Sequence, residues 1–150
     1  MNPNELFCGV ECYHSSNILD ALYVINHPGN ELNDYYFNVV DKSVYLYGKE
    51  IDIPNTITPI WLQSAKLCIA ERLVLHLYPI GKSPEIIDTY SDFLKSRCEM
   101  ILLIYDCYYA EIYCKNILWL NTIFDTLQKD PQVSVHKKFE STDTRTTMYV

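Results

Sequence analysis

The chain has 150 residues and a formal net charge of −7, with an isoelectric point near 4.9. This length suits one hydrophobic core, so we predict a single domain over residues 1–150. The 12 lysine and arginine residues are scattered, which disfavours nucleic-acid binding, and no apolar run approaches the ~20 residues that span a bilayer.

No leader pattern of a charged segment followed by an apolar one precedes the first predicted strand. We therefore expect a cytoplasmic protein that is not inserted in a membrane. In that reducing compartment the six cysteines are expected to be thiols and mostly buried, so the sequence predicts no disulfide framework.

Strand patterns recur along the chain as short runs of β-branched, aromatic and alternating residues. The two runs 35–40 and 43–47 flank Asp41-Lys42, which we interpret as a hairpin turn. Residues 100–105 are entirely apolar, which predicts a central strand covered on both faces. The predicted strands cover residues 6–12, 35–40, 43–47, 72–78, 100–105, 109–114, 132–139 and 147–150.

Helix signals fall between these runs. Ser15 or Ser16 is the expected N-cap of a first helix that carries Ile18, Leu22 and Ile25 on one stripe and ends at residues 27–30. A second helix is predicted over residues 59–65, after a cap at Thr58.

Two further helices have clearer caps. Thr89 and Asp92 resemble a capping box that begins a helix with Tyr90, Phe93 and Leu94 on its apolar stripe. Asn116 is the expected N-cap of a helix that runs to about Lys129. Its predicted buried face carries Ile117, Leu120, Phe124 and Leu127, with Trp119 at the margin.

The order of these elements predicts an α+β fold, with three to four helices packed on a mixed, largely antiparallel sheet. The central hairpin, which turns at residues 106–108, excludes a purely parallel, doubly wound sheet.

The second half of the chain carries residues typical of a known family. They are Tyr78-Pro79, the helix sequence from Thr89 to Leu94 followed by Ser96 and Cys98, Asp106, the run from Glu111 to Lys115, and the tail Asp143 to Thr146. From Leu73 to Val150 the chain resembles a family of small proteins of unknown function from spore-forming Gram-positive bacteria. The resemblance implies a cytoplasmic single-domain protein and supplies no catalytic residues.

Two candidate sites involve cysteine. Cys8, Cys12 and His14 would share one face of a regular strand, spread over about 20 Å, which is too wide for one tetrahedral metal site. Cys107 at the hairpin turn lies beside Asp106, and an acidic neighbour opposes formation of the nucleophilic thiolate. We therefore predict neither a metal nor a cofactor.

The tail and the hairpin supply the candidate binding residues. Asp143 and Arg145 lie in a loop rich in hydroxyl groups, where they could bind a carboxylate or phosphate or simply hold the turn. Tyr108, Tyr109 and Tyr113 on the central hairpin could present aromatic rings to a partner, unless helices cover both faces.

We therefore expect a non-enzymatic protein that binds a protein partner or forms a homo-oligomer. Its acidic charge suggests an immunity-type or inhibitor protein that binds a basic partner. The alternative is a small-ligand binder or an enzyme that uses Asp143, Arg145 and the hairpin acids Asp106 and Glu111.

Overall fold

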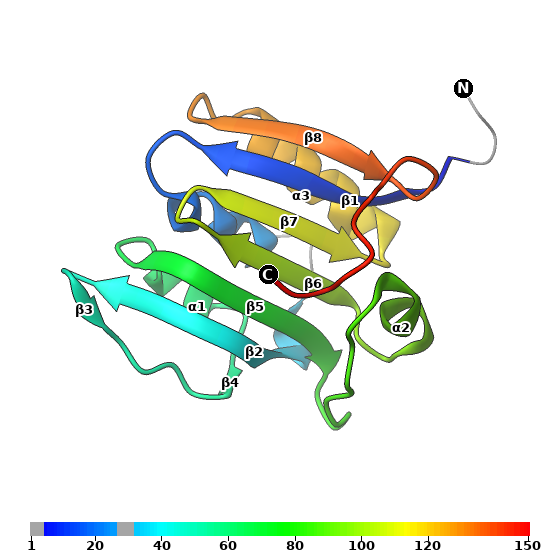
Figure 1. Ribbon diagram of the computed structural model, residues 1–150, viewed down its shortest axis with the longest axis horizontal. Coiled ribbons are helices and arrows are strands. Elements are labelled where there is room, and N and C mark those ends of the chain that lie inside the picture. The colour runs from blue at the N-terminus through cyan, green and yellow to red at the C-terminus, as the bar shows by residue number, and fades with distance from the viewer. Residues whose placement is uncertain (1–4, 27–31) are drawn as a thin grey trace.

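The computed structural model describes residues 5–26 and 32–150, which form one antiparallel sheet with helices on it (Figure 1). The sheet contains eight strands, in the order β3-β2-β5-β6-β7-β1-β8, and β4 pairs with β2 beside that path. The strands are β1 (Phe7–His14), β2 (Tyr35–Leu46), β3 (Lys49–Glu50), β4 (Thr56–Ile57), β5 (Ile69–Pro79), β6 (Met100–Tyr105), β7 (Tyr109–Cys114) and β8 (Val133–Phe139).

The helices are few and mostly short, so the fold is α+β and dominated by its sheet. Three are α-helices and three are 3-10 helices within the described residues. They are η1 (Ile18–Asp20), η2 (Leu22–Asn26), η3 (Leu32–Asp34), α1 (Trp61–Ser64), α2 (Tyr90–Lys95) and α3 (Ile117–Gln128).

The two faces of the sheet are covered differently. In Figure 1, α1 and α3 lie behind the sheet, on what we call the helix face. The C-terminal residues 140–150 cross in front, and we call this side the tail face. The larger hydrophobic cluster lies on the helix face and the smaller one lies on the tail face, where it includes Tyr78, Phe93 and Met148. The tail face therefore has less apolar cover.

The predicted central strand is confirmed. β6 occupies the middle of the sheet between β5 and β7, and its residues from Met100 to Ile104 are all buried. Leu102 and Ile104 pack on the helix face, whereas Ile101 and Leu103 pack on the tail face. A strand with both faces buried needs the continuous apolar run found here.

The predicted hairpin at Asp41-Lys42 is wrong. Residues 35–46 form one strand that pairs along its length with β5, with a β-bulge between Val39 and Asp41. The actual turn lies at Tyr47 and Gly48, whose φ angles are +51° and +78°. A bulge inserts one extra residue into a strand without reversing it, here Val40, and only the pairing with β5 distinguishes it from a turn.

The first predicted helix is also corrected. Asn17, not Ser15 or Ser16, is the N-cap, and the segment folds as the two short 3-10 helices η1 and η2. Ile18, Leu22 and Ile25 are nevertheless all buried, as their spacing indicated. The predicted end at residues 27–30 lies outside the described part of the chain. The second predicted helix shortens to α1, whose N-cap Ile60 makes no side-chain cap bond.

The two later helices are confirmed, with changes to their buried faces. Thr89 and Asp92 form a complete capping box at α2, and Asn116 caps α3. Phe93 is buried, whereas Leu94 is exposed. The buried face of α3 consists of Trp119, Leu120, Ile123 and Leu127, whereas the predicted Ile117 is 44% exposed.

The C-terminal strand predicted over residues 147–150 does not form. Thr147 makes a single antiparallel bridge to Thr89, and the Met148 N–H donates to the Asp88 carbonyl at 2.9 Å. The tail is thus attached to the segment before α2 rather than to an edge of the sheet. No helix in the described part of the chain is long and apolar enough to cross a bilayer.

Candidate functional site

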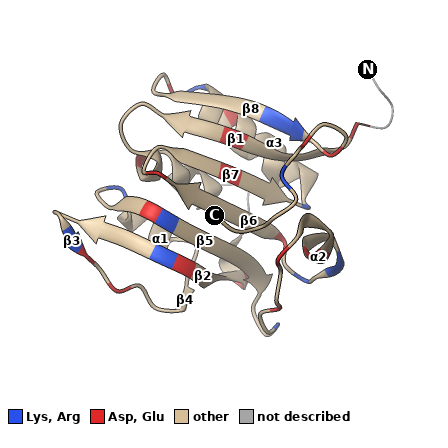
Figure 2. Ribbon diagram, viewed as in Figure 1, with Lys and Arg blue, Asp and Glu red and all other residues tan. Residues whose placement is uncertain are grey.

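Charged residues lie on β1, β7 and β8 and also on β2 and β5 (Figure 2), but the buried ones, Glu111 and Lys138, belong to β7 and β8. Cross-strand pairing explains this arrangement. Glu11 on β1 lies opposite Glu111 on β7 and opposite His136 on β8, and directly opposed residues share a face. Gly9 likewise lies opposite Lys138. Three strands distant in sequence thereby contribute to one site.

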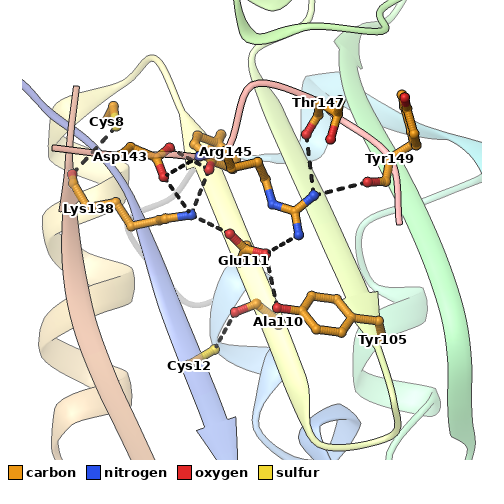
Figure 3. A network of polar contacts seen from close by, with 11 residues as sticks. Cys8, Cys12, Tyr105, Ala110, Glu111, Lys138, Asp143, Arg145, Thr147 and Tyr149 are labelled. Atoms are coloured by element: carbon orange, nitrogen blue, oxygen red, sulfur yellow. Dashed lines mark hydrogen bonds and ion pairs between the residues drawn. The ribbon is translucent and has the colours of Figure 1, made fainter. Parts of the chain in front are cut away.

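A buried ionic network forms its centre (Figure 3). Glu111 receives hydrogen bonds from Lys138 and from Arg145, whose Nη2 lies 2.7 Å from Oε2 of Glu111. The Tyr105 hydroxyl donates to the same carboxylate at 3.0 Å. Nζ of Lys138 also lies 3.2 Å from Oδ1 of Asp143. Two cations and two carboxylates thus neutralise one another beneath the tail.

Tyr113 links the two halves of this network. Its hydroxyl donates to Asp143 at 2.6 Å and accepts from Lys138 at 2.7 Å. Tyr113 lies opposite Gly9, where an added Cβ would come within 2.4 Å of the Ile112 carbonyl oxygen and 3.3 Å of the Tyr113 ring. A side chain at position 9 is therefore excluded by the closeness of the neighbouring backbone and ring.

The network holds its groups in fixed protonation states. Burial alone would raise the pKa values of Glu111 and Asp143, but hydrogen bonds from Arg145, Lys138 and Tyr113 hold them below their usual range. Burial and the hydrogen bond to Asp143 raise the pKa of Tyr113. Both carboxylates are therefore ionised and the phenol is protonated at neutral pH, so neither acid is tuned for proton transfer near neutrality.

A group of tyrosines lies beside the network, and we call Tyr13, Tyr105, Tyr108 and Tyr109 the tyrosine surface. The rings of Tyr105 and Tyr109 stack with centroids 5.6 Å apart and an interplanar angle of 12°. The ring centroid of Tyr13 lies 5.2 Å from that of Tyr109 and 6.1 Å from that of Tyr108. Tyr13, Tyr108 and Tyr109 are each about 40% exposed, so their rings reach solvent.

Two adjacent cavities open on this face, and Glu11 lines both. The first, of about 310 Å³, is lined by Tyr13, Tyr105, Tyr109 and His136 among others. The second, of about 390 Å³, lies between Glu111 and the hydroxyl-rich tail loop. Glu11 is exposed and forms no ion pair with any residue in the described ranges.

The predicted binding residues lie in different environments. Asp143 and Arg145 are brought together with Glu111, and Tyr108 and Tyr109 are exposed. Tyr113 is fully buried, so the expectation that it presents its ring to a partner is wrong. Its position opposite Gly9 and beneath the tail explains this, because alternation alone does not reveal which face the tail covers.

The hairpin acids do not act as a pair. Glu111 lies opposite Leu103 on β6, whereas Asp106 lies in the turn with a φ of +53°. The neighbouring Cys107 is partly exposed. The pKa of its thiol is raised mainly by partial burial and secondly by the negative charge of Asp106. The turn therefore favours the thiol over the nucleophilic thiolate.

The expectation that Cys8, Cys12 and His14 share a face is corrected. A register shift at Cys8 turns it toward the tail face, whereas Cys12 packs in the cluster on the helix face. His14 accepts hydrogen bonds from the Ser16 and Asn17 N–H groups at 3.0 and 2.9 Å. Within residues 5–26 and 32–150, no three His, Cys, Asp or Glu side chains are grouped to hold a metal.

Sequence reasoning missed Glu11, Tyr13 and Lys138. The alternation of β1 places Glu11 and Tyr13 on one face, which was a usable signal. Their pairing with β7, about 100 positions later in the chain, had no local signal. Lys138 follows another lysine in an edge strand, where lysine is ordinarily a solvated residue.

The second half of the chain is similar to known proteins. Residues 67–149 match the family described as protein of unknown function (DUF2691). An uncharacterized protein of Bacillus subtilis (strain 168), YncE, is 39% identical over 77 residues, which cover 51% of this chain and 50% of that protein. The chain therefore spans about half the length of this relative.

No solved structure matches the chain. The family match begins just before β5 and includes all the charged residues of the network, whereas Glu11 and Tyr13 lie before it. The match covers more than half of the chain and agrees with the resemblance that the motifs of the second half indicated. The chain belongs to the family of proteins of unknown function DUF2691.

Proposed function

We propose that this protein binds a basic segment of a partner protein through the tyrosine surface and Glu11. The observation that carries the proposal is the cavity in which Tyr13, Tyr105 and Tyr109 surround space next to the exposed Glu11 carboxylate. Aromatic faces attract lysine and arginine by cation–π interactions, and an adjacent carboxylate adds a charge-assisted hydrogen bond. The net charge of −7 would also steer a basic partner toward the protein.

The ionic network supports this role as a rigid base rather than as a second ligand site. Arg145 donates to Glu111 and to the Thr147 and Tyr149 carbonyls, so its guanidinium is directed into the protein. Tyr105 connects the network to the tyrosine surface through Glu111. A fixed ring loses little conformational entropy when it binds, which favours recognition by this surface.

The test uses a tetra-arginine peptide, with tetra-glutamine and tetra-glutamate peptides of equal length as controls. Nuclear magnetic resonance titration of the whole chain should move the signals of Tyr13, Tyr105, Tyr109 and Glu11 with tetra-arginine and leave them unchanged with the controls. Tyr109→Ala should weaken binding by about fivefold, which is the worth of one exposed cation–π contact.

Matched variants separate the site from general acidity. Tyr47→Ala removes a tyrosine that is 83% exposed on the β2–β3 turn, and Glu50→Gln removes an exposed acid on β3. Neither should change the affinity, whereas Glu11→Gln should lower it. Equal losses in Glu11→Gln and Glu50→Gln, or shifts spread over every acidic residue, would contradict the proposal.

A second copy of the chain is the other partner that the sequence predicts. Sedimentation of the wild-type protein and of Tyr109→Ala over a range of concentrations distinguishes self-association from binding of a basic partner. An increase in mass that Tyr109→Ala abolishes would assign the tyrosine surface to self-association and overturn the basic partner.

A further inference from the structure

His76 on β5 is a buried side chain without a hydrogen-bond partner. It is 1% exposed, and neither ring nitrogen has a partner among the described residues. Nearly all buried polar groups in proteins are paired, because an unpaired one costs roughly 1–3 kcal/mol. A ligand that hydrogen-bonds to the His76 ring would remove this cost.

A cavity of about 430 Å³ opens onto His76. It lies on the part of the tail face formed by β2 and β5, beneath the extended segment before α2. Asn38, directly opposite His76 on β2, lines it together with Glu85 and Asp88 of that segment. Its volume falls in the range of small-molecule sites.

The β-bulge of β2 shapes this cavity. The register shift between Val39 and Asp41 leaves Val40 as an extra residue, and both valines line the cavity. The Val39 N–H donates outward to the Asn55 carbonyl at 2.8 Å, and Asn55 also lines the cavity. Bulges occur often next to functional sites, and this one lies beside the Asn38–His76 pair.

The lining selects the charge of the ligand. It contains the two carboxylates of Glu85 and Asp88, the side-chain amides of Asn38 and Asn55, and no lysine or arginine. Burial lowers the pKa of His76 to about 4, so the imidazole is neutral at pH 7 and one ring nitrogen accepts a hydrogen bond. Two carboxylates and no cation in the lining favour a ligand that carries positive charge and donates N–H bonds.

We propose that this cavity binds a small organic amine, whose ammonium group donates to the His76 imidazole while the carboxylates of Glu85 and Asp88 balance its charge. The aliphatic side chains of Ile86 and Ile87 would contact the hydrocarbon part of such a ligand. This site shares no lining residue with the two cavities at Glu11. It is thus independent of the proposed function.

The test uses putrescine, a linear diamine, with 1,4-butanediol as its neutral counterpart and succinate as an anionic one. Resonance of the His76 ring nitrogens in the ¹⁵N-labelled whole chain should shift with putrescine, and calorimetry should show a single saturable site. Butanediol should bind at least about tenfold more weakly, and succinate should not bind, because the lining offers it only like charge.

Three variants test the assignment. His76→Phe keeps an aromatic ring but removes both nitrogens, and it should weaken putrescine binding by about tenfold or more. Asp88→Asn changes an exposed rim residue, so it tests the site without disturbing the core, and it should weaken binding severalfold. Asp125→Asn, an exposed acid on α3 across the sheet, should leave the affinity unchanged.

The outcomes separate this site from the tyrosine surface. Putrescine binding that Tyr109→Ala leaves intact would support an independent site, whereas loss in that variant would overturn it. An unchanged His76 resonance, equal affinity for butanediol, or equal effects of Asp88→Asn and Asp125→Asn would also overturn the proposal, and solvent would then be the partner of His76.

Discussion

Two buried polar sites on the same face of the sheet have opposite electrostatic designs. Around Glu111, each buried charge has a partner of opposite sign within hydrogen-bond distance. At His76, the buried group is kept neutral and has no partner among the described residues. A protein interior therefore accommodates ionisable groups either by pairing them or by removing their charge, and the two solutions respond differently to mutation and pH.

The largest expected effect comes from breaking the paired site. Lys138→Met leaves the carboxylates of Glu111 and Asp143 buried without one of their cations, and we expect it to lower the free energy of unfolding by about 3–5 kcal/mol. Urea denaturation at pH 7 measures this change. Lys137→Met, at the neighbouring exposed lysine, is the control, and an equal loss there would show that the buried pairing is not the cause.

The unpaired site should appear in the pH dependence of stability. The pKa of His76 falls from 6.5 to about 4 on folding, so the unfolded chain binds an extra proton between these values. The contribution of His76 to the free energy of unfolding is therefore constant above pH 6.5. It declines as the pH falls toward 4, by about 3 kcal/mol in total at 1.36 kcal/mol per pH unit.

Denaturation midpoints of the wild type and of His76→Leu over pH 4–7 test this dependence. The leucine variant should lose most of the slope. Glu85 and Asp88 line the same cavity, and an identical slope in both proteins would assign the pH dependence to carboxylates instead.

A smaller effect is expected at the residue that links the network. Tyr113→Phe keeps the ring beneath the tail but removes the hydroxyl that bonds to Asp143 and Lys138. Hydrogen bonds to charged groups are each worth about 1.5–3 kcal/mol, and part of this is recovered by relaxation, so we expect a loss of about 2 kcal/mol. Chemical denaturation of Tyr108→Phe, at an exposed tyrosine, should show almost no change.

The smallest effect is expected at the edge of the network. Glu11 is exposed and lies opposite the buried Glu111, and like charges opposed across strands repel one another. Glu11→Gln should therefore change stability by no more than about 0.5 kcal/mol, in the stabilising direction. A loss of several kcal/mol on thermal denaturation would place Glu11 inside the ionic network rather than at its margin.

Much of the local structure followed from the sequence. The apolar run of residues 100–105 identified the central strand, because a doubly covered strand cannot alternate. The capping residues Thr89 and Asn116 located the starts of α2 and α3, since these caps satisfy backbone groups within a few residues. The motifs of the second half also identified the family.

Tertiary structure decided the features that depend on pairing between distant segments. The bulge in β2 resembles a turn until β5 is placed beside it, and Tyr113 resembles a surface ring until the tail covers it. Asp143 and Arg145 were recognised as candidates, but their partners Glu111 and Lys138 come from other strands. Local sequence determines the period and the ends of elements, whereas cross-strand register determines which side chains meet.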